Sequence, residues 1–131
     1  FGAVIVKDDK IVGQGSNLVT STNDPTAHAE IVAIRDACRR LGTFSLAGCT
    51  IHSSCEPCPM CLAAIYWARI DEIHYGASRD DAAAAGFNDA FIYDEIGLPP
   101  VERSVPARQA LREEALKAFE AWADFDGRTE Y

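Results

Sequence analysis

Two short groups of residues carry side chains that could hold a metal ion and move a proton. The first is His28-Ala29-Glu30, and the second is Cys55-Glu56-Pro57-Cys58-Pro59-Met60-Cys61. One imidazole and two thiolates form a tetrahedral Zn²⁺ set that leaves the fourth position open for a water. Bound zinc can lower the pKa of such a water to about 7. A carboxylate such as Glu30 beside it could then carry the proton, so the spacing predicts a catalytic zinc site.

The cysteine spacing allows two ligand pairs. Cys58 and Cys61 lie three residues apart at the start of an expected helix, where exposed N–H groups lower thiol pKa values. We therefore expect both thiols to ionise at neutral pH. Cys55 and Cys58 have the same spacing and form a rival pair, although Pro57 directly before Cys58 favours the first one. A purely structural zinc would prefer a fourth protein ligand and would not need Glu30.

Length and composition indicate one globular domain over residues 1–131. The chain has 131 residues and a formal net charge of −8, which disfavours nucleic acids and anionic membranes as partners. No apolar run approaches the roughly 18 residues of a membrane span. Five cysteines, three of them crowded into seven residues, do not resemble a disulfide framework. We expect a reduced, cytoplasmic protein.

The hydrophobic pattern alternates between strands and helices. It predicts strands over residues 1–6, from residue 11, over 49–53 and over 71–76. It predicts helices over residues 26–41 and 57–68, in the Ala-rich segment that follows the last strand, and from about residue 107. A hairpin followed by right-handed crossovers gives a three-layer α/β/α fold, in which a mixed sheet has helices on both faces.

Several details of these elements can be predicted as well. Gly13 and Gly15 are expected to end the second strand, while Asp24 caps the first long helix and Pro25 lies in its first turn. The helix over 57–68 has no charge and is expected to be buried nearly all round. The first long helix is expected to bury a stripe formed by Ile31, Ile34, Cys38 and Leu41, and to expose Glu30, Arg35, Asp36, Arg39 and Arg40. In the last helix Leu111, Ala115, Phe119 and Trp122 form a docking stripe, and Phe119 and Trp122 are expected in the core.

The order H-x-E followed by P-C-x-x-C is the signature of zinc-dependent base deaminases, in which the glutamate is the acid and base. Over essentially its full length the chain resembles the cytidine-deaminase-like superfamily, and within it most closely the bacterial guanine deaminases. The closer likeness rests on residues 1–6, 23–30, 54–69, 85–89 and 91–93, and on Glu130-Tyr131.

This resemblance implies a reaction and a set of site residues. The expected reaction is attack of a zinc-activated hydroxide on C2 of guanine, which gives xanthine and ammonia, with Glu30 as proton shuttle and Asp89 as a second catalytic residue. The implied zinc ligands are His28, Cys58 and Cys61. The implied substrate-binding residues are Asn17, the Ala29 backbone amide, the aromatic walls Phe1 and Phe87, Asp89 at the 2-amino end of the base, and Tyr131.

The resemblance also leaves alternatives open. Another aminopurine, a purine nucleoside or an aminotriazine could be the substrate, and a tRNA adenosine is disfavoured by the negative charge. A non-catalytic zinc-binding interaction protein is the alternative from another class. Family members commonly form homodimers, and some lend the segment equivalent to residues 107–131 to the partner. The family also begins with a helix that this chain does not contain before its first strand, and we expect that helix to precede Phe1.

Overall fold

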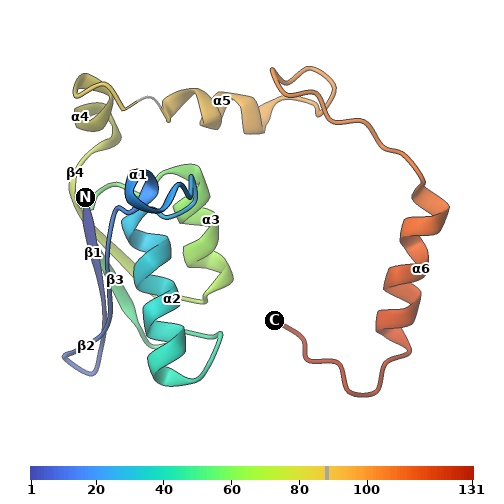
Figure 1. The fold of residues 1–131 in the computed structure, drawn as a ribbon, viewed down its shortest axis with the longest axis horizontal. Helices are drawn as coiled ribbons and strands as arrows, with labels where there is room; N and C mark the ends of the chain where they lie inside the picture. Colours follow the sequence, from blue (N-terminus) through green and yellow to red (C-terminus); the bar gives the residue numbers. More distant parts are fainter. Residues whose placement is uncertain (88) are drawn as a thin grey trace. The chain divides into compact units, whose positions relative to one another are not determined.

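The structure, a computed structural model, describes residues 1–87 and 89–131 (Figure 1). The chain divides into two compact units, Phe1–Tyr93 and Asp94–Tyr131. The expected zinc ligands and Glu30 all belong to the first unit. None of the described helices is long and apolar enough to cross a membrane.

A four-stranded mixed sheet forms the centre of the first unit, as predicted. Strands β1 (Gly2–Lys7) and β2 (Lys10–Ser16) form an antiparallel hairpin, and β1 also pairs antiparallel with β3 (Thr50–Cys55). Strand β4 (Glu72–Ala77) lies parallel to β3, so the spatial order is β2-β1-β3-β4. The parallel pair brings the end of β3, which leads into the cysteine motif, beside the end of β4.

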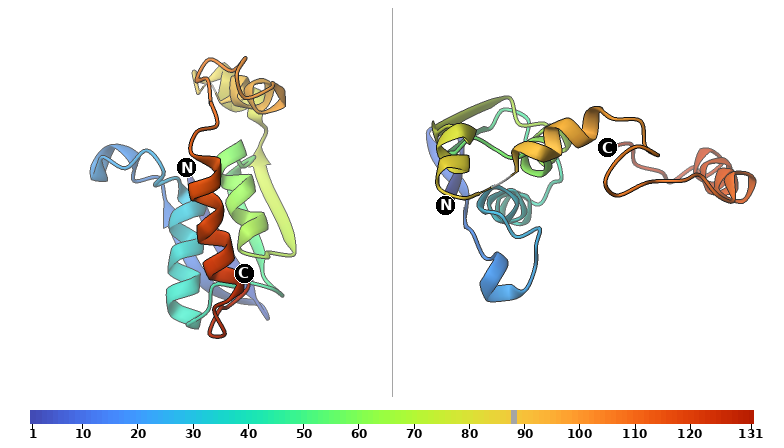
Figure 2. Two further views of the ribbon diagram at one scale, coloured as in Figure 1. Left: turned by 90° about the vertical axis from the view of Figure 1, so that its right-hand side faces the viewer. Right: turned by 90° about the horizontal axis from the view of Figure 1, so that it is seen from above.

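Two helices, α2 (Ala29–Leu41) and α3 (Pro59–Trp67), cover the same face of this sheet (Figures 1 and 2). Helix α3 is the crossover between the parallel strands β3 and β4. The core between the helices and the sheet is made of buried small and aliphatic side chains: Ala3, Ile5, Ala29, Ala33, Ala37, Leu46, Cys49, Ile51, Ile65 and Ala68.

The opposite face of the sheet carries polar and half-buried side chains. His52 and His74 are register partners on β3 and β4, and their rings stack there with centroids 4.9 Å apart. His74 also pairs with Glu72, with 3.2 Å between Nε2 and Oε1. In the described part of the first unit no helix lies on this face (Figures 1 and 2). The prediction of helices on both faces of the sheet is therefore met on one face only in the described part of this unit.

Helix α2 lies directly on strand β2 because two glycines make room for it. A Cβ at Gly15 would lie 2.3 Å from the carbonyl oxygen of Ala29 and 2.6 Å from the nitrogen of Ala33. A Cβ at Gly13 would lie 2.6 Å from the carbonyl oxygen of Ala33 and 2.6 Å from Cβ of Ala37. The prediction that these glycines end the strand is wrong, since β2 continues to Ser16. Their role is to permit a close approach of helix and strand.

This close contact also changes which face of α2 is buried. The buried residues of the helix are Ala29, Glu30, Ala33, Asp36 and Ala37. The predicted stripe of larger side chains is only half-buried, and Leu41 is 39% exposed. Only small side chains fit against the strand at this distance, so the alanine face forms the contact.

Glu30 and Asp36 were predicted to face solvent, and both are buried instead. Asp36 accepts a hydrogen bond from the Gln14 backbone N–H, at 3.1 Å from Oδ2, and pairs with Arg39 and Arg40. Burial alone would raise the pKa of Asp36, but the Gln14 N–H and the Arg40 guanidinium together hold it below its usual value. The carboxylate thereby ties α2 to β2.

Helix α3 is buried on one side only, although its lack of charge predicted burial nearly all round. Pro59, Cys61 and Ile65 are buried, whereas Tyr66 and Trp67 are 69% and 62% exposed. The helix packs against the sheet with its inner side, and its outer side carries these exposed aromatic rings. This outer side is therefore an apolar surface.

Short helices complete the first unit. They are α1 (Val19–Thr22) and α4 (Arg79–Ala84), which follows β4 as the Ala-rich segment predicted. Ser78 caps α4 by accepting a hydrogen bond from the Asp81 N–H, and the Asp81 carboxylate accepts one from the Ser78 N–H. Such a capping box fixes the point at which the chain leaves the sheet. Helix α5 (Ala90–Gly97) runs across the division between the two units.

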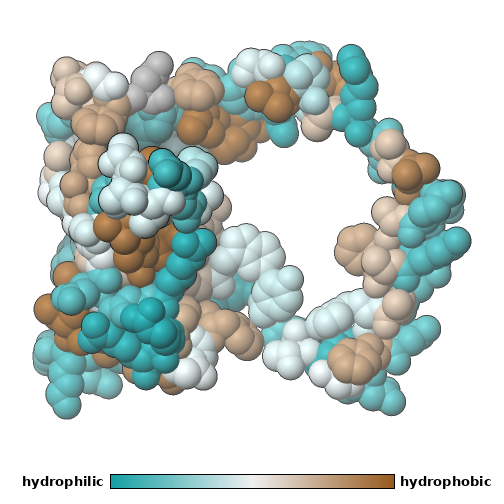
Figure 3. All heavy atoms as spheres, in the orientation of Figure 1, coloured by the Kyte–Doolittle hydropathy of each residue, from teal (hydrophilic) through white to brown (hydrophobic). Residues whose placement is uncertain are grey.

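The second unit contains α6 (Arg112–Ala123), which begins a few residues later than predicted. Helix α6 has no buried residue, and Phe119 and Trp122 are 70% and 43% exposed, so their expected place in the core is wrong. Figure 3 shows hydrophilic side chains along one edge of the helix and more hydrophobic ones along the other. The unit is too small to bury that apolar edge by itself.

Candidate active site

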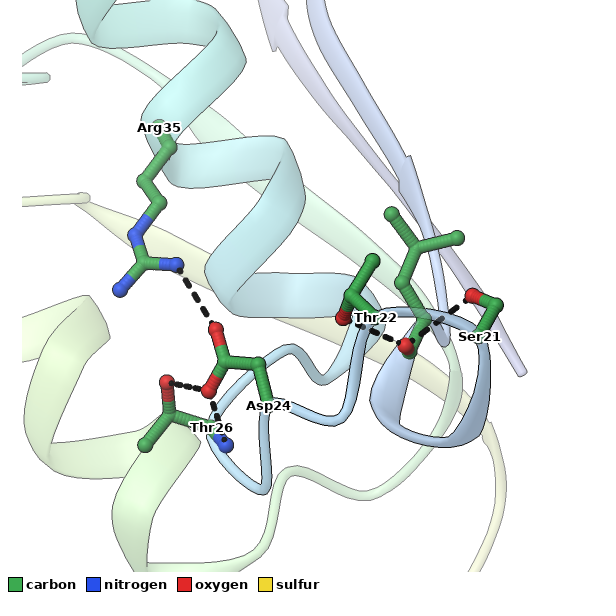
Figure 4. Close-up of polar contacts among 6 residues, drawn as sticks. Ser21, Thr22, Asp24, Thr26 and Arg35 are labelled. Carbon is green, nitrogen blue, oxygen red and sulfur yellow. Dashed lines mark hydrogen bonds and ion pairs between the residues drawn. The ribbon is translucent and has the colours of Figure 1, made fainter.

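The chain that leads into α2 is held by short polar contacts (Figure 4). Asp24 Oδ1 accepts hydrogen bonds from the Thr26 backbone N–H at 2.8 Å and the Thr26 hydroxyl at 2.6 Å, and its Oδ2 lies 3.7 Å from Arg35. The bond from the Thr26 hydroxyl is the largest cause of a lowered Asp24 pKa. Asp24 therefore stabilises a turn and does not cap α2 as predicted, because the helix begins only at Ala29. The turn places His28 at the N-terminal end of α2.

His28 and Cys58 occupy equivalent positions, each as the N-cap of a helix. His28 precedes α2 with φ −66° and ψ 156°, and Cys58 precedes α3 with φ −64° and ψ 167°. Both backbones are extended, so the side chains lie at the helix ends rather than along the helix faces. Glu30 and Cys61 follow within the first turns. A ligand over the two N-termini can thus meet side chains from both helices.

His28, Cys58 and Cys61 are placed to bind one zinc ion. The His28 Nδ1 lies 3.6 Å from each sulfur, and the three ligand atoms are all within 4.8 Å of one another. With Zn–N and Zn–S bonds of about 2.0 Å and about 2.3 Å, tetrahedral ligands are about 3.6 Å apart. The distances and the donor set therefore fit a zinc site with three protein ligands and an open fourth position.

The two sulfurs differ in their affinity for a proton. A hydrogen bond from the Cys61 thiol lowers the pKa of Cys58 to about 6. Donating that bond, together with burial, raises the pKa of Cys61. The prediction that both thiols ionise at neutral pH stays a prediction for the zinc-bound site. A coordinated zinc ion deprotonates its thiol ligands outright.

The other cysteines stand apart from this site. Cys55 donates a hydrogen bond from Sγ to the Ser78 carbonyl oxygen at 3.7 Å, and burial raises the pKa of its thiol. Among the described residues only His28, Cys58 and Cys61 form a group that could hold a metal ion. The rival pair of Cys55 and Cys58 is thus not supported. Cys49 lies within the hydrophobic core, and the partly buried Cys38 packs against it.

A pocket of about 360 Å³ opens beside the zinc ligands. His28, Ala29, Glu30 and Cys58 line it next to the metal site. The pocket also brings together five of the six predicted substrate-binding positions: Phe1, Asn17, Ala29, Phe87 and Asp89. The sixth, Tyr131, belongs to the second unit, and its role stays a prediction.

Two aromatic rings form part of the pocket wall. Phe1 and Phe87 meet edge to face, with ring centroids 4.9 Å apart and planes at 82°. The backbone N–H of Asn17 donates to the Phe1 carbonyl oxygen at 3.1 Å, and the Asn17 side-chain oxygen accepts from the Val19 N–H at 3.1 Å. These bonds orient the Asn17 carboxamide, whose NH₂ group keeps its own two donors.

Asp89 contributes an unsatisfied acceptor to this pocket. Its Oδ1 is buried and has no hydrogen-bond partner among the described residues. A buried acceptor left unpaired costs about 1–3 kcal/mol. A pocket-lining carboxylate in this state is suited to a ligand that brings N–H donors.

The structure also contains a set of contacts, formed by Glu56, Arg79 and Tyr93 and called the clamp below, that was not predicted from the sequence. Glu56 accepts a hydrogen bond from the Arg79 backbone N–H at 3.0 Å, and the Tyr93 hydroxyl donates to the Pro57 carbonyl oxygen at 3.3 Å. The Arg79 guanidinium lies 5.2 Å above the centre of the Tyr93 ring. The segment that carries Phe87 and Asp89 is therefore tied at both ends to the cysteine motif. Its only sequence signal is Glu56 inside that motif.

Comparison with known proteins identifies relatives of this chain. The family described as the cytidine and deoxycytidylate deaminase zinc-binding region matches residues 1–77. Guanine deaminase of Bacillus subtilis is 55% identical over 131 residues, which span 100% of this chain and 84% of that protein. The X-ray structure of guanine deaminase from Bacillus subtilis superposes with a TM-score of 0.96 at 55% identity, covering 99% of this chain and 83% of that one. A tRNA-specific adenosine deaminase of Agrobacterium fabrum is 37% identical over 125 residues, 88% of this chain and 82% of the relative.

The chain belongs to the cytidine and deoxycytidylate deaminase family. Its sheet, its two N-capping ligands and its Cys58–Cys61 pair are those of a zinc-dependent aminohydrolase of this fold. The predicted fold class and the predicted zinc cofactor are thereby confirmed.

Proposed function

We propose that this protein hydrolyses guanine at C2 to xanthine and ammonia. The observation that carries the proposal is the unpaired Asp89 Oδ1 in the pocket that adjoins the zinc ligands. The identity of 55% over the whole chain to a guanine deaminase supports the same substrate.

Asp89 is complementary to one edge of guanine. That edge presents the ring N1–H and the exocyclic 2-NH₂, which are both hydrogen-bond donors, and an ionised carboxylate is acceptor-only. A base without these donors would leave the carboxylate unpaired and buried, which is the condition for strong discrimination. Asp89 would therefore hold the amino group that leaves.

The remaining pocket residues would fix the plane of the ring. Phe1 and Phe87 offer an apolar wall, the Asn17 NH₂ group can donate to a purine acceptor, and the Ala29 backbone N–H lies at the free N-terminus of α2. These groups bind and orient the base, with its C2 toward the zinc ligands. The 360 Å³ volume is at the small end for ligand pockets and suits a free base.

Glu30 would carry the proton. It is 7% exposed and lines the pocket beside His28, so its carboxylate reaches both the metal site and the substrate. His28, Cys58 and Cys61 would hold Zn²⁺, which when bound supplies Lewis-acid activation of a water. Glu30 would accept one proton as the water oxygen bonds to C2 and pass it to ring N3, where the C2=N3 double bond opens. It would then carry the second proton, from the hydroxyl group on C2, to the 2-amino nitrogen. The bond from C2 to the amino nitrogen breaks, ammonia leaves, and C2 becomes the second carbonyl carbon of xanthine.

The charge of the pocket argues against substrates that carry phosphate. Its described lining includes the carboxylates of Glu30, Glu56 and Asp89 and neither lysine nor arginine. The whole chain carries a net charge of −8. A tRNA substrate would meet repulsion where it needs phosphate contacts.

Ammonia release by the zinc-loaded protein tests the proposal. Guanine, guanosine, adenine, cytosine, cytidine and an aminotriazine are assayed in parallel, and guanine is expected to turn over fastest with xanthine as product. Asp89→Asn should lose most of this activity, while the matched change Asp80→Asn on the exposed surface of α4 should retain it. If none of the six compounds released ammonia, the proposal would be rejected in favour of a non-catalytic zinc protein.

A second substrate class shares the recognised edge. Other 2-aminopurines and aminotriazines also place an amino group beside a ring nitrogen, so Asp89 could accept from them as well. Turnover of the aminotriazine above that of guanine would favour this alternative.

A homodimer is part of the proposed function. Tyr66 on α3, and Phe119 and Trp122 on α6, are large exposed aromatic side chains, and large exposed apolar patches are rare on soluble monomers. We propose that α3 or the segment 107–131 is covered by a second copy of the chain. In the swapped form Tyr131 would complete the partner's pocket. The five free cysteines fit the reducing cytoplasm as the place of action.

A further inference from the structure

Ser53 places a hydroxyl group at a position of β3 that faces the helices. The side chains of Ile51, Ser53 and Cys55 alternate toward this buried face, while those of His52 and Ser54 are exposed. Ser53 is 8% exposed, and its register partners are Ala3 on β1 and Tyr75 on β4. An inward-facing strand position normally holds an apolar side chain. The hydroxyl group therefore needs a partner.

That partner is the carboxylate of Glu30. Ser53 Oγ donates a hydrogen bond to Glu30 Oε1 at 3.2 Å, and both residues are buried, at 8% and 7% exposed. The other oxygen, Oε2, lies 3.5 Å from the Cys61 sulfur. The two carboxylate oxygens thus have different neighbours: Oε1 is bound to the sheet and Oε2 faces the zinc ligands.

The hydrogen bond from Ser53 fixes the orientation of the Glu30 carboxylate. Glu30 has several rotatable side-chain bonds, so the helix alone does not fix the direction of its carboxylate. Strand β3 lies inside the sheet between β1 and β4, and it is a rigid support for the donor. Holding one oxygen leaves the other at a defined place beside the metal site. Positioning of this kind is needed because an error of about 1 Å in a catalytic group can cost about 100-fold in rate.

We propose that Ser53 is a positioning residue for Glu30, which holds Oε1 so that Oε2 faces the zinc site and the substrate. This inference rests on the proposed function, in which Glu30 carries the proton. Ser53 touches neither zinc ligand nor substrate in this role. Its effect is on the chemical step and not on binding of the base.

The test compares Ser53→Ala with Ser53→Thr in the zinc-loaded protein. Ser53→Ala should lower kcat for guanine roughly 10- to 100-fold, the range for a lost hydrogen bond to a charged group, with KM within about twofold. Ser53→Thr keeps the hydroxyl group and should recover most of kcat. The matched control Thr50→Val removes a hydroxyl group from the same strand without a contact to Glu30, and should leave kcat unchanged.

A double-mutant cycle separates positioning from a structural effect. If Ser53 acts only through Glu30, Ser53→Ala should slow the Glu30→Gln enzyme by less than about twofold, whereas independent effects would multiply. A second readout is independent of turnover: in the Co²⁺-substituted protein, Ser53→Ala and Glu30→Gln should alter the visible absorption bands in the same direction. Zinc content should match wild type, and the loss of unfolding free energy should not exceed about 1–3 kcal/mol, the cost of leaving one buried acceptor unpaired.

The outcomes are distinct for the two proposals. A wild-type protein that is active on guanine, with normal kcat in Ser53→Ala, overturns the positioning role alone. A multiplicative effect in the double mutant, or unchanged Co²⁺ bands, also overturns it. If the wild-type protein deaminates none of the bases, the proposed function and this inference are overturned together.

Discussion

At the scale of single residues, the site depends on His28 lying outside its helix. Within a regular helix His28 and Glu30 would be about 200° apart around the axis, since each residue turns by about 100°. As the N-cap, His28 instead turns its Nδ1 toward the two sulfurs, while Glu30 in the first turn points into the pocket. Both can therefore act at one ion. This arrangement supports the proposed division of roles, with metal binding by His28 and proton transfer by Glu30.

Replacement of the proton carrier should abolish turnover without loss of metal. Glu30→Gln preserves shape and a hydrogen-bond acceptor for Ser53 but cannot take up a proton. We expect kcat for guanine to fall at least about 100-fold, the lower range for general acid–base catalysis. Metal analysis should still give one zinc per chain. Glu72→Gln, an exposed change on β4, is the control, and near-normal kcat in Glu30→Gln would remove Glu30 from the mechanism.

The ligand set can be tested through metal content. Cys58→Ser and Cys61→Ser should each reduce bound zinc to a small fraction of one per chain, measured by elemental analysis after dialysis, because their sulfurs face His28 Nδ1 at 3.6 Å. Cys55→Ser should retain zinc, since its thiol is engaged with the Ser78 carbonyl group. Zinc loss in Cys55→Ser equal to that in Cys58→Ser would restore the rival ligand pair.

At the scale of elements, the site depends on how closely α2 approaches β2. Gly13 and Gly15 allow the alanine face of the helix to lie on the strand, and the Asp36 carboxylate reaches back to the Gln14 N–H. The start of α2, with His28 and Glu30, is thereby fixed against the sheet. The start of α3, with Cys58 and Cys61, is fixed by the end of β3. The metal site forms where these two helix ends meet.

A single methyl group should disturb this arrangement. Gly15→Ala would place its Cβ 2.3 Å from the Ala29 carbonyl oxygen, which belongs to a helix backbone and cannot move aside freely. We expect a loss of unfolding free energy of about 1–3 kcal/mol, the usual cost of overpacking, measured by urea denaturation. Activity should fall as well, because α2 carries His28 and Glu30.

Gly97→Ala is the control for this change. A Cβ at Gly97, the last residue of α5, would meet nothing within 4 Å, so its stability should match wild type. Equal stability of Gly15→Ala and Gly97→Ala would contradict the close packing of α2 on β2.

At the scale of the whole molecule, the proposed homodimer would cover apolar side chains that are exposed in each unit. Tyr66 on α3, and Phe119 and Trp122 on α6, are among them. The predicted role of Tyr131 also depends on the arrangement of the dimer, because the tail could complete the pocket of its own chain or that of the partner. Sedimentation analysis should give twice the chain mass.

Truncation and complementation distinguish the two arrangements. Deletion of Glu130 and Tyr131 should strongly lower kcat for guanine and leave the melting temperature unchanged. When the truncated chain is unfolded and refolded together with full-length Glu30→Gln, a swapped dimer should regain activity, because a pocket with intact Glu30 then receives Tyr131 from its partner. An unswapped dimer should stay inactive. Normal kinetics of the truncated chain would make Tyr131 a dispensable tail.

The sequence by itself determined the chemistry and the order of the elements. His28, Glu30, Cys58 and Cys61 were predicted from residue type and spacing, because metal ligands and proton carriers must be particular side chains. The strands, the two site helices and the mixed sheet followed from local hydrophobic patterns. Of the six predicted substrate-binding positions, Asp89 and four others line one pocket. Their placement came from resemblance and not from any local pattern.

The tertiary structure decided which surfaces meet. Local periodicity placed Ile31 and Ile34 in the core of the first long helix and Glu30 and Asp36 outside it, and the close contact with Gly13 and Gly15 reversed this choice. The hydrogen bond of Ser53 with Glu30, and the clamp of Glu56, Arg79 and Tyr93, join residues more than twenty positions apart. No local pattern encodes such pairs, because burial and hydrogen bonding depend on distances that exist only after the helices have packed on the sheet.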